Sequence, residues 1–211
     1  MLKLSDYEKD VLMEVISIGI GNASKALADM INSKIYIKIL TFDARSVKKI
    51  QEELSKNRDL SAGIFVRITG NINGVLFFIT SRKNALILSD ILQKKKLGTT
   101  KMLGMMDRSA LEELTSILAA KFLTSLNKFL GINAIHTAPS TVFNFGDSIL
   151  NFVLMSSEKK FESGLICKIV FGRDKDEVDG EFIIILDAQS TKTLLDRIKN
   201  KEGFSKGKVK L

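Results

Sequence analysis

Two segments of this chain, 99 residues apart, carry the same pattern of side chains. Residues 10–32 align with residues 109–131 without a gap, and in both halves the segment precedes strand-like runs, a hairpin signal and a further helical stretch. A duplicated unit has to bury the same faces twice. The repeat therefore predicts an α+β fold, a duplicated helix-plus-antiparallel-strand unit with pseudo-twofold symmetry and a shared sheet. The matched pairs are Leu12 and Leu111, Glu14 and Glu113, Ser17 and Ser116, Ile18 and Ile117, and Leu27 and Leu126.

Helix caps and turn residues locate the elements along the chain. Ser5 with Glu8 forms a capping-box pattern at the start of the first long helix, and Gly131 ends the second, for which Asp107 or Ser109 is the expected cap. The expected helices cover about 5–31, 81–95, 107–130 and 190–199, and the expected strands 34–40, 63–69, 74–80, 132–142, 148–156, 164–171 and 181–186. Segment 70–74 contains Asn-Gly, which indicates a hairpin, 44–56 is expected to be helical or a long connection, and 174–180 a charged hairpin loop.

The charge distribution bears on domains and partners. The net charge is +8, and segment 199–211 contributes +4 of it through five lysines and one glutamate. We expect residues 1–198 to form a single domain made of two repeats, about 5–100 and 105–198, followed by a basic, disordered tail at 199–211. A basic tail can bind nucleic acid or a membrane surface. Because no aromatic residues alternate with the lysines, a solvated tail without nucleic-acid partners is favoured.

The sequence contains few residues for metal or redox chemistry. A lone cysteine, Cys167, cannot form an internal disulfide, and with the lone histidine, His136, it cannot build a metal site. Cys167 lies in the apolar run LICKIVF, which favours a buried, unreactive thiol. No uninterrupted apolar run approaches a membrane span and the N-terminus lacks the apolar core of a signal peptide. We therefore expect no membrane insertion and a cytoplasmic protein.

The repeated helices each present a polar stripe. Residues three and four positions apart share one helix face. A solvated helix face explains one such stripe, but its occurrence at equivalent positions in both copies favours a functional surface. The stripes are Asp10, Glu14 and Ser17 in the first copy and Ser109, Glu113 and Ser116 in the second.

The stretch EVISIGIGNASKAL, residues 14–27, contains Gly19, Gly21 and Ser24 with the spacing of a loose phosphate-binding loop. Such a loop follows a strand and opens a helix, whereas these glycines follow about four turns of helical pattern. We expect instead that the small residues allow the helix to pack closely on the sheet, with the polar stripe on the opposite side.

These motifs resemble the CheC / CheX / FliY phosphatases, and CheC above all. The family motif is Asp or Ser, three residues, Glu, two residues, Asn, twenty-two residues, and Pro. Its second copy matches at Ser109, Glu113, Ser116 and Pro139, and in the first copy Leu40 stands at the proline position. I-G-x-G-N-A-x-x-A-L is present at residues 18–27, the T-G-x-I-x-G hairpin at 69–79, and L-x-x-F-L-G at 126–131.

The resemblance implies a phosphatase of the phosphorylated chemotaxis regulator CheY. In that family the glutamate pairs with a lysine of the regulator and the asparagine orients the attacking water. The implied catalytic residues are Glu14, Ser17, Glu113 and Ser116, and the implied partner-binding residues Asp10, Ser109 and Pro139. No cofactor of its own is implied, because the regulator supplies Mg²⁺. The implied partners are phosphorylated CheY and the deamidase CheD, and a monomer is expected.

Both asparagine positions of the motif are serine in this chain. A serine hydroxyl can bond to water but is shorter than a carboxamide, and a misplacement of about 1 Å can cost on the order of a hundredfold in rate. Three functions are consistent with Ser17 and Ser116: a weak phosphatase, a protein that binds phosphorylated CheY without hydrolysing it, and a partner of CheD.

Overall fold

The computed structural model describes residues 4–56, 58–155, 160–173 and 176–201. The predicted disordered tail, 199–211, lies outside the described residues from 202 onward. Its first residue, Lys199, is the last residue of a helix, so the folded part of the chain extends slightly further than expected.

The two long repeated helices are present as predicted. They are α1 (Asp6–Ile31) and α4 (Met105–Leu130), and both their starts and their ends are 99 residues apart. Ser5 caps α1 in a complete capping box with Glu8, which satisfies N–H groups that have no partner within the helix. The alignment of the two halves is therefore also a structural alignment.

The two ends of α4 were predicted with unequal success. Gly131 ends the helix in the left-handed conformation, with a φ of 64°, as expected for a residue without a Cβ. The assignment of Asp107 or Ser109 as the cap is wrong, because the helix begins at Met105. Asp107 instead accepts a hydrogen bond from the Gly104 N–H at 2.8 Å and so caps the first turn from inside it.

In the described part of the chain, seven strands form one antiparallel sheet with the order β1-β6-β7-β3-β2-β4, and β5 also pairs with β2. Exchanging each first-half strand with its counterpart reproduces the same order in reverse, which confirms the predicted pseudo-twofold symmetry. The strands are β1 (Tyr36–Ser46), β2 (Leu60–Gly70), β3 (Gly74–Ser81), β4 (Ala134–His136), β5 (Ser140–Phe145), β6 (Phe161–Arg173) and β7 (Asp176–Asp187).

The two repeats exchange their outer strands. β1 of the first half pairs with β6 of the second, and β4 and β5 of the second half pair with β2 of the first. The β2–β3 hairpin around Asn-Gly is present as predicted. Because the outer strand of each half completes the sheet of the other half, neither repeat forms its part of the sheet alone.

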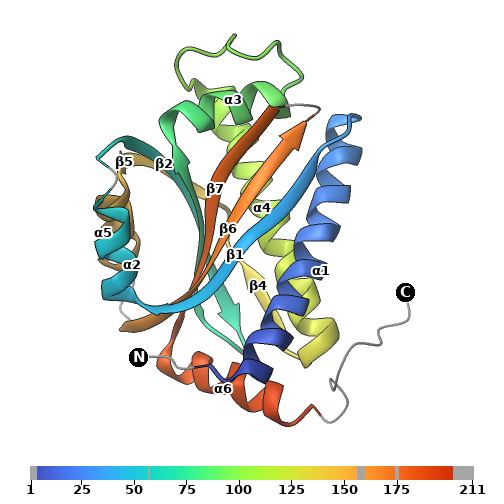
Figure 1. The fold of residues 1–211 in the computed structure, drawn as a ribbon, viewed down its shortest axis with the longest axis vertical. Coiled ribbons are helices and arrows are strands. Elements are labelled where there is room, and N and C mark those ends of the chain that lie inside the picture. Colours follow the sequence, from blue (N-terminus) through green and yellow to red (C-terminus); the bar gives the residue numbers. More distant parts are fainter. Residues whose placement is uncertain (1–3, 57, 156–159, 174–175, 202–211) are drawn as a thin grey trace.

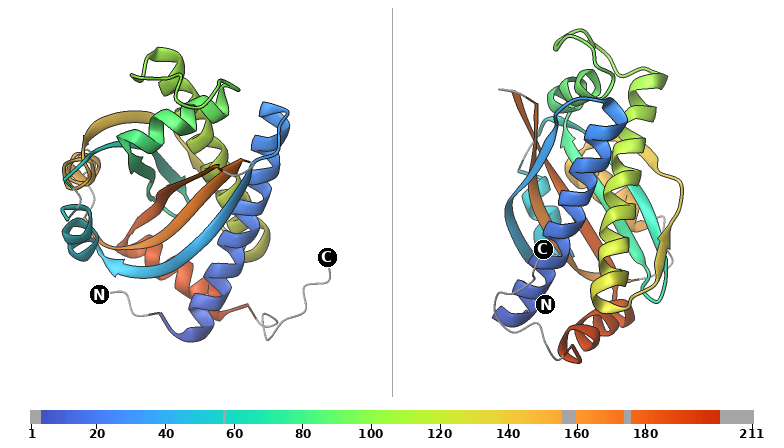
Figure 2. Two further views of the ribbon diagram at one scale, coloured as in Figure 1. Left: turned by 45° about the horizontal axis from the view of Figure 1, so that its top comes forward. Right: turned by 90° about the vertical axis from the view of Figure 1, so that its right-hand side faces the viewer.

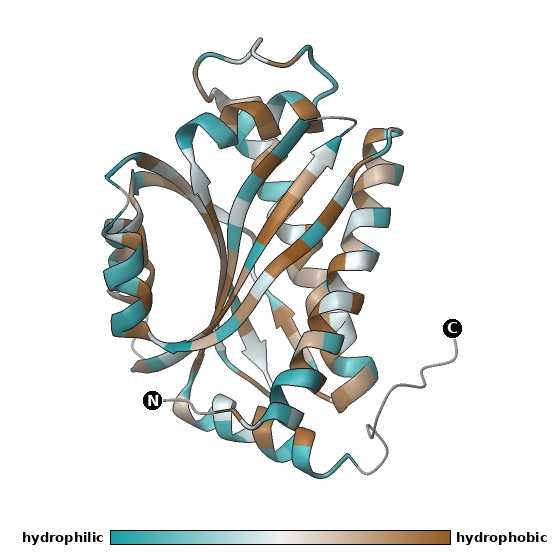
Figure 3. Ribbon diagram, in the orientation of Figure 1, coloured by the Kyte–Doolittle hydropathy of each residue, from teal (hydrophilic) through white to brown (hydrophobic). Residues whose placement is uncertain are grey.

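Helices cover both faces of the sheet (Figure 1). α1, α4, α3 and α6 bury one set of alternating strand residues, and α2 and α5 bury the other set against a smaller second core. Figure 3 shows polar residues alternating with apolar ones along β1 and the polar outer side of α2. The remaining helices are α2 (Val47–Leu54), α3 (Arg82–Leu92), α5 (Gly146–Met155) and α6 (Ala188–Lys199).

Three elements of the second half were predicted wrongly. The single strand expected at 132–142 is divided into β4 and β5, which are separated by residues 137–139. Residues 148–156 were expected to form a strand, but they lie mostly in α5, where Ile149, Leu150 and Val153 are buried at helical spacing. A short apolar run fits either element, and burial under the sheet decides it. The charged loop expected at 174–180 is shorter, because β7 begins at Asp176. In the first half, 44–56 ends β1 and then forms α2.

Helix α1 is long and apolar enough, by length and composition, to cross a membrane. The expectation of no such segment considered only uninterrupted apolar runs, and α1 interrupts its apolar residues with a few charges. Its residues Val11, Leu12, Val15 and Ile16 are at most 1% exposed and belong to the main core. A buried core helix has this arrangement, and a membrane-spanning one would expose those side chains to lipid.

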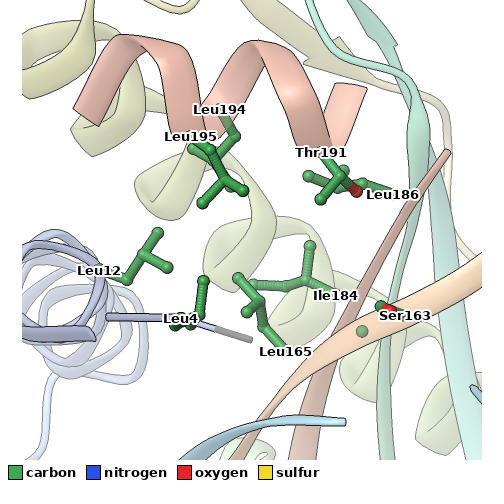
Figure 4. A pocket seen from close by; sticks show the side chains of 10 residues that line it. Leu4, Leu12, Ser163, Leu165, Ile184, Leu186, Thr191, Leu194 and Leu195 are labelled. Carbon is green, nitrogen blue, oxygen red and sulfur yellow. The ribbon is translucent and has the colours of Figure 1, made fainter. Parts of the chain in front are cut away.

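Close to the start of α1, a small cavity lies between α1, α6 and the sheet (Figure 4). Leu12, Leu194 and Leu195 point toward it, and its volume is about 10 Å³. That is about the space of one water molecule, and the lining offers few polar groups. The cavity is a packing gap and not a ligand site.

Candidate functional site

Helices α1 and α4 lie side by side and run antiparallel (Figures 1 and 2). The two helices pack tightly at Gly19, where a Cβ would lie 3.0 Å from Phe122 Cα. Gly19 therefore packs against α4. The sequence had predicted that it packs against the sheet. Gly21 is exposed, and a Cβ there would meet no atom within 4 Å. The expected packing role of Gly21 is wrong, because it lies on the outer side of the helix.

The first stripe lies on the outer side of α1. Asp10 and Ser17 are exposed and Glu14 is half-buried. Among the described residues, none forms a hydrogen bond or ion pair with any of these three side chains. The stripe therefore offers two carboxylates and a hydroxyl whose hydrogen-bonding capacity is not used within the fold.

The second stripe occupies the equivalent side of α4. Ser109 and Glu113 are exposed and Ser116 is half-buried. These side chains likewise have no hydrogen-bond or ion-pair partner within the part of the chain that the structure describes. An exposed carboxylate with no cation beside it is available to a lysine or arginine of another protein.

The two stripes form separate sites. Glu14 lies five residues before Gly19, and Glu113 lies nine residues before Phe122, on helices that run in opposite directions. At about 1.5 Å per residue, the two carboxylate positions are roughly 20 Å apart along the helix axes. The structure brings together the residues of each stripe but not the two stripes.

Pro139 lies beside the second stripe. Thr141 of β5 donates a hydrogen bond to Glu112 Oε1 at 2.7 Å, and Arg108 stacks on the ring of Phe143 at 4.9 Å. β5 thus runs along α4 toward the helix start. Pro139 precedes Thr141 by two residues. At about 3.3 Å per strand residue and about 1.5 Å per helix residue, this step corresponds to about four residues of α4 beyond Glu112, which brings Pro139 level with Ser116. Pro139 sits in the gap between β4 and β5, at the edge of the sheet.

Leu40 occupies the position of Pro139 in the first half. The pairing of β1 with β6 shifts register between Ile39 and Thr41, so Leu40 forms a bulge in the edge strand, and its side chain is 59% exposed. The second half has a break in the strand at the same place. Both copies therefore interrupt their edge strand beside the stripe, one with a bulge and the other with a proline.

The flanks of the two stripes differ in charge. β1 carries a charged cluster in which Arg45 bonds both Asp43, at 2.9 Å, and Glu53. The hydrogen bond from Arg45 lowers the pKa of Asp43, and nearby Lys9 on α1 adds a smaller effect. The positions of β5 that match Asp43 and Arg45 are Val142 and Asn144, which carry no charge.

Each long helix is anchored at its start by a buried acid in its first turn. Burial alone would raise the pKa of Asp107, but hydrogen bonds from Ser89, the Gly104 N–H, Gln93 and Lys95 together hold it well below the usual range.

The equivalent residue of α1 is Glu8. It accepts hydrogen bonds from the Ser5 N–H and hydroxyl, and Lys199 of α6 lies 3.7 Å from its carboxylate. At Glu8 the lysine is Lys199 of α6, from the end of the second half. At Asp107 it is Lys95, which follows α3 in the first half. Each of these two buried acids therefore joins the two halves of the chain.

Beyond the second stripe, α4 and β4 enclose an open groove. Its lining residues are Ala120, Leu123, Thr124, Asn127, Asn133, Ala134, Ile135 and His136. His136 Nδ1 lies 2.9 Å from the Thr137 carbonyl, and no carboxylate is among the described residues that line the groove. The groove therefore contains no acid–base pair, and no role for His136 follows from it.

Elsewhere the described residues offer little for catalysis. Burial raises the pKa of Cys167 to about 12, so the thiol is inert, as predicted. No group of three His, Cys, Asp or Glu side chains in the described part of the chain is arranged to hold a metal ion. Within the described residues, the stripes are the two groups of carboxylate and hydroxyl side chains that recur at equivalent positions.

The sequence reasoning overlooked part of the second stripe's surroundings. Arg108, Glu112 and Thr141 orient the stripe relative to β5, and nothing in their spacing reveals these contacts. Three methionines before Ser109 could have been found from the run MLGMM at 102–106. Apolar residues clustered at the start of an exposed helix are an unusual pattern.

The chain is similar to known proteins in sequence and in fold, although no protein-family model matches it. The chain is 26% identical over 174 residues to the CheY-P phosphatase CheC of Bacillus subtilis, covering 77% of this chain and 79% of that protein. Thermotoga maritima FliY has a TM-score of 0.76 and 18% identity, over 95% of this chain and 100% of that chain. A chain of the Borrelia burgdorferi CheX–CheY–BeF₃–Mg²⁺ complex has a TM-score of 0.51 and 18% identity, over 82% and 97%.

Fold and sequence together define a duplicated α+β protein that is similar to CheC in sequence and to FliY in fold. The resemblance to the CheC, CheX and FliY family is confirmed, through sequence by CheC and through fold by FliY and CheX. The fold is CheC-like.

Proposed function

We propose that this chain docks on a phosphorylated CheY-type response regulator and hydrolyses its aspartyl phosphate slowly. One observation carries the proposal: a Glu–Ser stripe, exposed or half-buried and without internal partners, occurs twice at equivalent places in a CheC-like fold. The similarity to CheC supports this role, as does the occurrence of the same fold in a complex with CheY.

In the proposed reaction the chain contributes positioning and the regulator contributes the reactive groups. Glu14 or Glu113 pairs with a lysine beside the regulator's phosphoaspartate, and the regulator holds the Mg²⁺. Ser17 or Ser116 then holds a water molecule in line with the phosphorus atom. Positioning of this kind reduces the entropy cost of the attack, and the short reach of serine makes it less effective than asparagine.

The test is the decay of a ³²P-labelled CheY receiver domain with and without the chain. We expect a modest acceleration that is lost in the double variant Glu14→Gln, Glu113→Gln. Glu162→Gln, an exposed carboxylate on β6, is the matched control. A decay rate that stays the same at saturating wild-type protein would exclude hydrolysis.

A second candidate is a non-catalytic adaptor that binds phosphorylated CheY or the deamidase CheD. It is favoured by the serines at both water-positioning sites, Ser17 and Ser116. Titration of each partner against the chain separates it from the first candidate: binding without faster decay supports the adaptor. Absence of binding to both partners would remove it.

The proposal also includes a cytoplasmic, monomeric protein. The regulator is a cytoplasmic partner, and the long apolar helix α1 is accounted for by its place in the core. Sedimentation of the free chain would show a single species of 23.4 kDa.

A further inference from the structure

Three exposed methionines precede the second stripe. Met102, Met105 and Met106 are 76%, 84% and 71% exposed. Met105 and Met106 are the first two residues of α4, one turn before Ser109, so their side chains flank the stripe where the helix begins. Methionine side chains are flexible and polarizable, and they are frequent on surfaces that bind other proteins.

The loop that carries Met102 is held firmly by a buried carboxylate. Asp90 of α3 is fully buried and accepts hydrogen bonds from the Thr99 N–H at 3.0 Å, the Thr100 N–H at 3.1 Å and the Thr100 hydroxyl at 2.6 Å. A buried charge is expensive unless it is well bonded, so these contacts define one conformation of the loop. The methionines therefore project from a rigid base.

The start of α4 is held in the same way. Asp107 is 7% exposed and bonds Lys95 at 3.1 Å, which ties the first helical turn to the end of α3. Asp90 and Asp107 lie on either side of the three methionines in the sequence. Two buried carboxylates thus stabilise a segment in which Leu103 packs against the main core while the three methionine side chains face solvent.

We propose that Met102, Met105 and Met106 form the apolar part of the regulator-docking surface at the second stripe. The inference rests on the proposed function, since the occupant is the same phosphorylated receiver domain. The cluster is continuous with the stripe: Met105 is eight residues before Glu113, roughly 12 Å along the helix. The surface thus fits a partner with an apolar patch at about that distance from the lysine that meets Glu113.

In the described residues, from 4 onward, the first stripe has no methionines before it. The positions of α1 equivalent to Met105 and Met106 are Asp6 and Tyr7, and the Tyr7 hydroxyl bonds the Lys201 carbonyl at 3.2 Å. Apolar area removed from water contributes most of the affinity of a typical protein interface, whereas exposed charges mainly set its specificity and association rate. The second stripe is therefore the stronger docking site.

The test measures binding of a CheY receiver domain loaded with Mg²⁺ and beryllofluoride as a phosphoryl mimic. We expect the triple variant Met102→Gln, Met105→Gln, Met106→Gln to bind at least about tenfold more weakly, which is about 1.4 kcal/mol. Met155→Gln is the matched control, because Met155 is 86% exposed but lies on α5 at the opposite face. The single variant Met105→Gln, with an expected loss of a few fold, checks the result without altering the loop.

Glu113→Gln measured in parallel separates this inference from the proposed function. Weaker binding by Glu113→Gln with unchanged binding by the methionine variants would overturn the methionine surface and leave the docking function in place. No binding by the wild-type chain would overturn both. Thermal unfolding of each variant is expected to match the wild type within a few degrees. If the triple variant proves to be unfolded and Met105→Gln binds as tightly as the wild type, the result counts against the proposal.

Discussion

The two stripes differ in their surroundings more than in their own residues. Both place a glutamate and a serine three residues apart on the outer side of a long helix. Beside the first, β1 carries Arg45 with its two carboxylate partners and a bulge at Leu40. Beside the second, β5 contributes Thr141 and Pro139, and methionines extend the helix surface. Duplication preserves the positions of the central residues, and the flanking segments make one copy different from the other.

The anchors of the two helices show the same inequality. Asp107 is bonded by four groups and lies within the α3–α4 junction, whereas Glu8 relies on its own capping box and on Lys199, whose side chain is 63% exposed. Both carboxylates are buried, but Asp107 has more hydrogen-bond donors than Glu8, and each bond to a buried charged group contributes to stability. The second stripe thus projects from the more firmly held helix.

The largest expected effect comes from restoring the missing amide. Ser116→Asn should raise the rate of regulator dephosphorylation by up to about a hundredfold, because the longer carboxamide positions the attacking water better than a hydroxyl does. Ser17→Asn should raise it less, because Leu40 stands where the second copy has Pro139. The decay of labelled CheY measures both. Equal gains would show that the two sites are equivalent, and no gain at either would show that the docking geometry of the family is lost.

Removing the stronger anchor should destabilise the protein and change its response to acid. Asp107→Asn is expected to lower the free energy of unfolding by about 2 kcal/mol at neutral pH, the range for a lost hydrogen-bonded charge. The pKa of Asp107 is depressed in the folded protein. Its stabilisation is therefore present above the unfolded pKa of about 3.9 and is lost as the pH falls below it.

Chemical denaturation between pH 3 and pH 7 checks this prediction, and Glu8→Gln is the comparison. The wild type should lose more stability than Asp107→Asn over the acid part of the range. A similar loss from Glu8→Gln at neutral pH would mean that the two anchors are equally important.

Two glycines of α1 should respond in opposite directions. Gly19→Ala places a Cβ 3.0 Å from Phe122 Cα, and we expect a loss of about 1 kcal/mol, the balance of overpacking and improved helix propensity. Gly21→Ala meets no neighbour and should gain up to about 1 kcal/mol. Thermal unfolding of the two variants measures the difference. A gain in both would mean that the helix pair is loosely packed at Gly19.

The smallest effect is expected from giving the first copy its proline. Leu40→Pro should change the free energy of unfolding by less than about 1 kcal/mol, because Leu40 is an exposed bulge residue in an edge strand, where proline is tolerated. Ile37→Pro is the control, because Ile37 is buried and paired with Phe171. Similar losses from both substitutions would show that the bulge is less permissive than its register shift indicates.

Most of the fold was predictable because its signals are local. Ser5 with Glu8, the Asn-Gly hairpin and Gly131 mark their elements through caps and turns that depend on neighbouring residues only. The misassigned α5 shows the limit: its run of apolar residues suits a strand or a helix until the face that it covers is known. The two extra residues at the start of α4 depend on Asp107 and its partners, which lie up to 18 residues away in sequence.

The sequence by itself determined the duplication, the 99-residue register and the residues of both stripes, because repeated spacing is visible in one dimension. Only the tertiary structure decided that the halves exchange strands, that Gly19 faces α4 while Gly21 faces solvent, and that the two stripes are separate. Those properties depend on how the helices cross and which strands meet, which in turn depend on contacts between residues far apart in the chain. The difference between the two stripes arises from these same contacts.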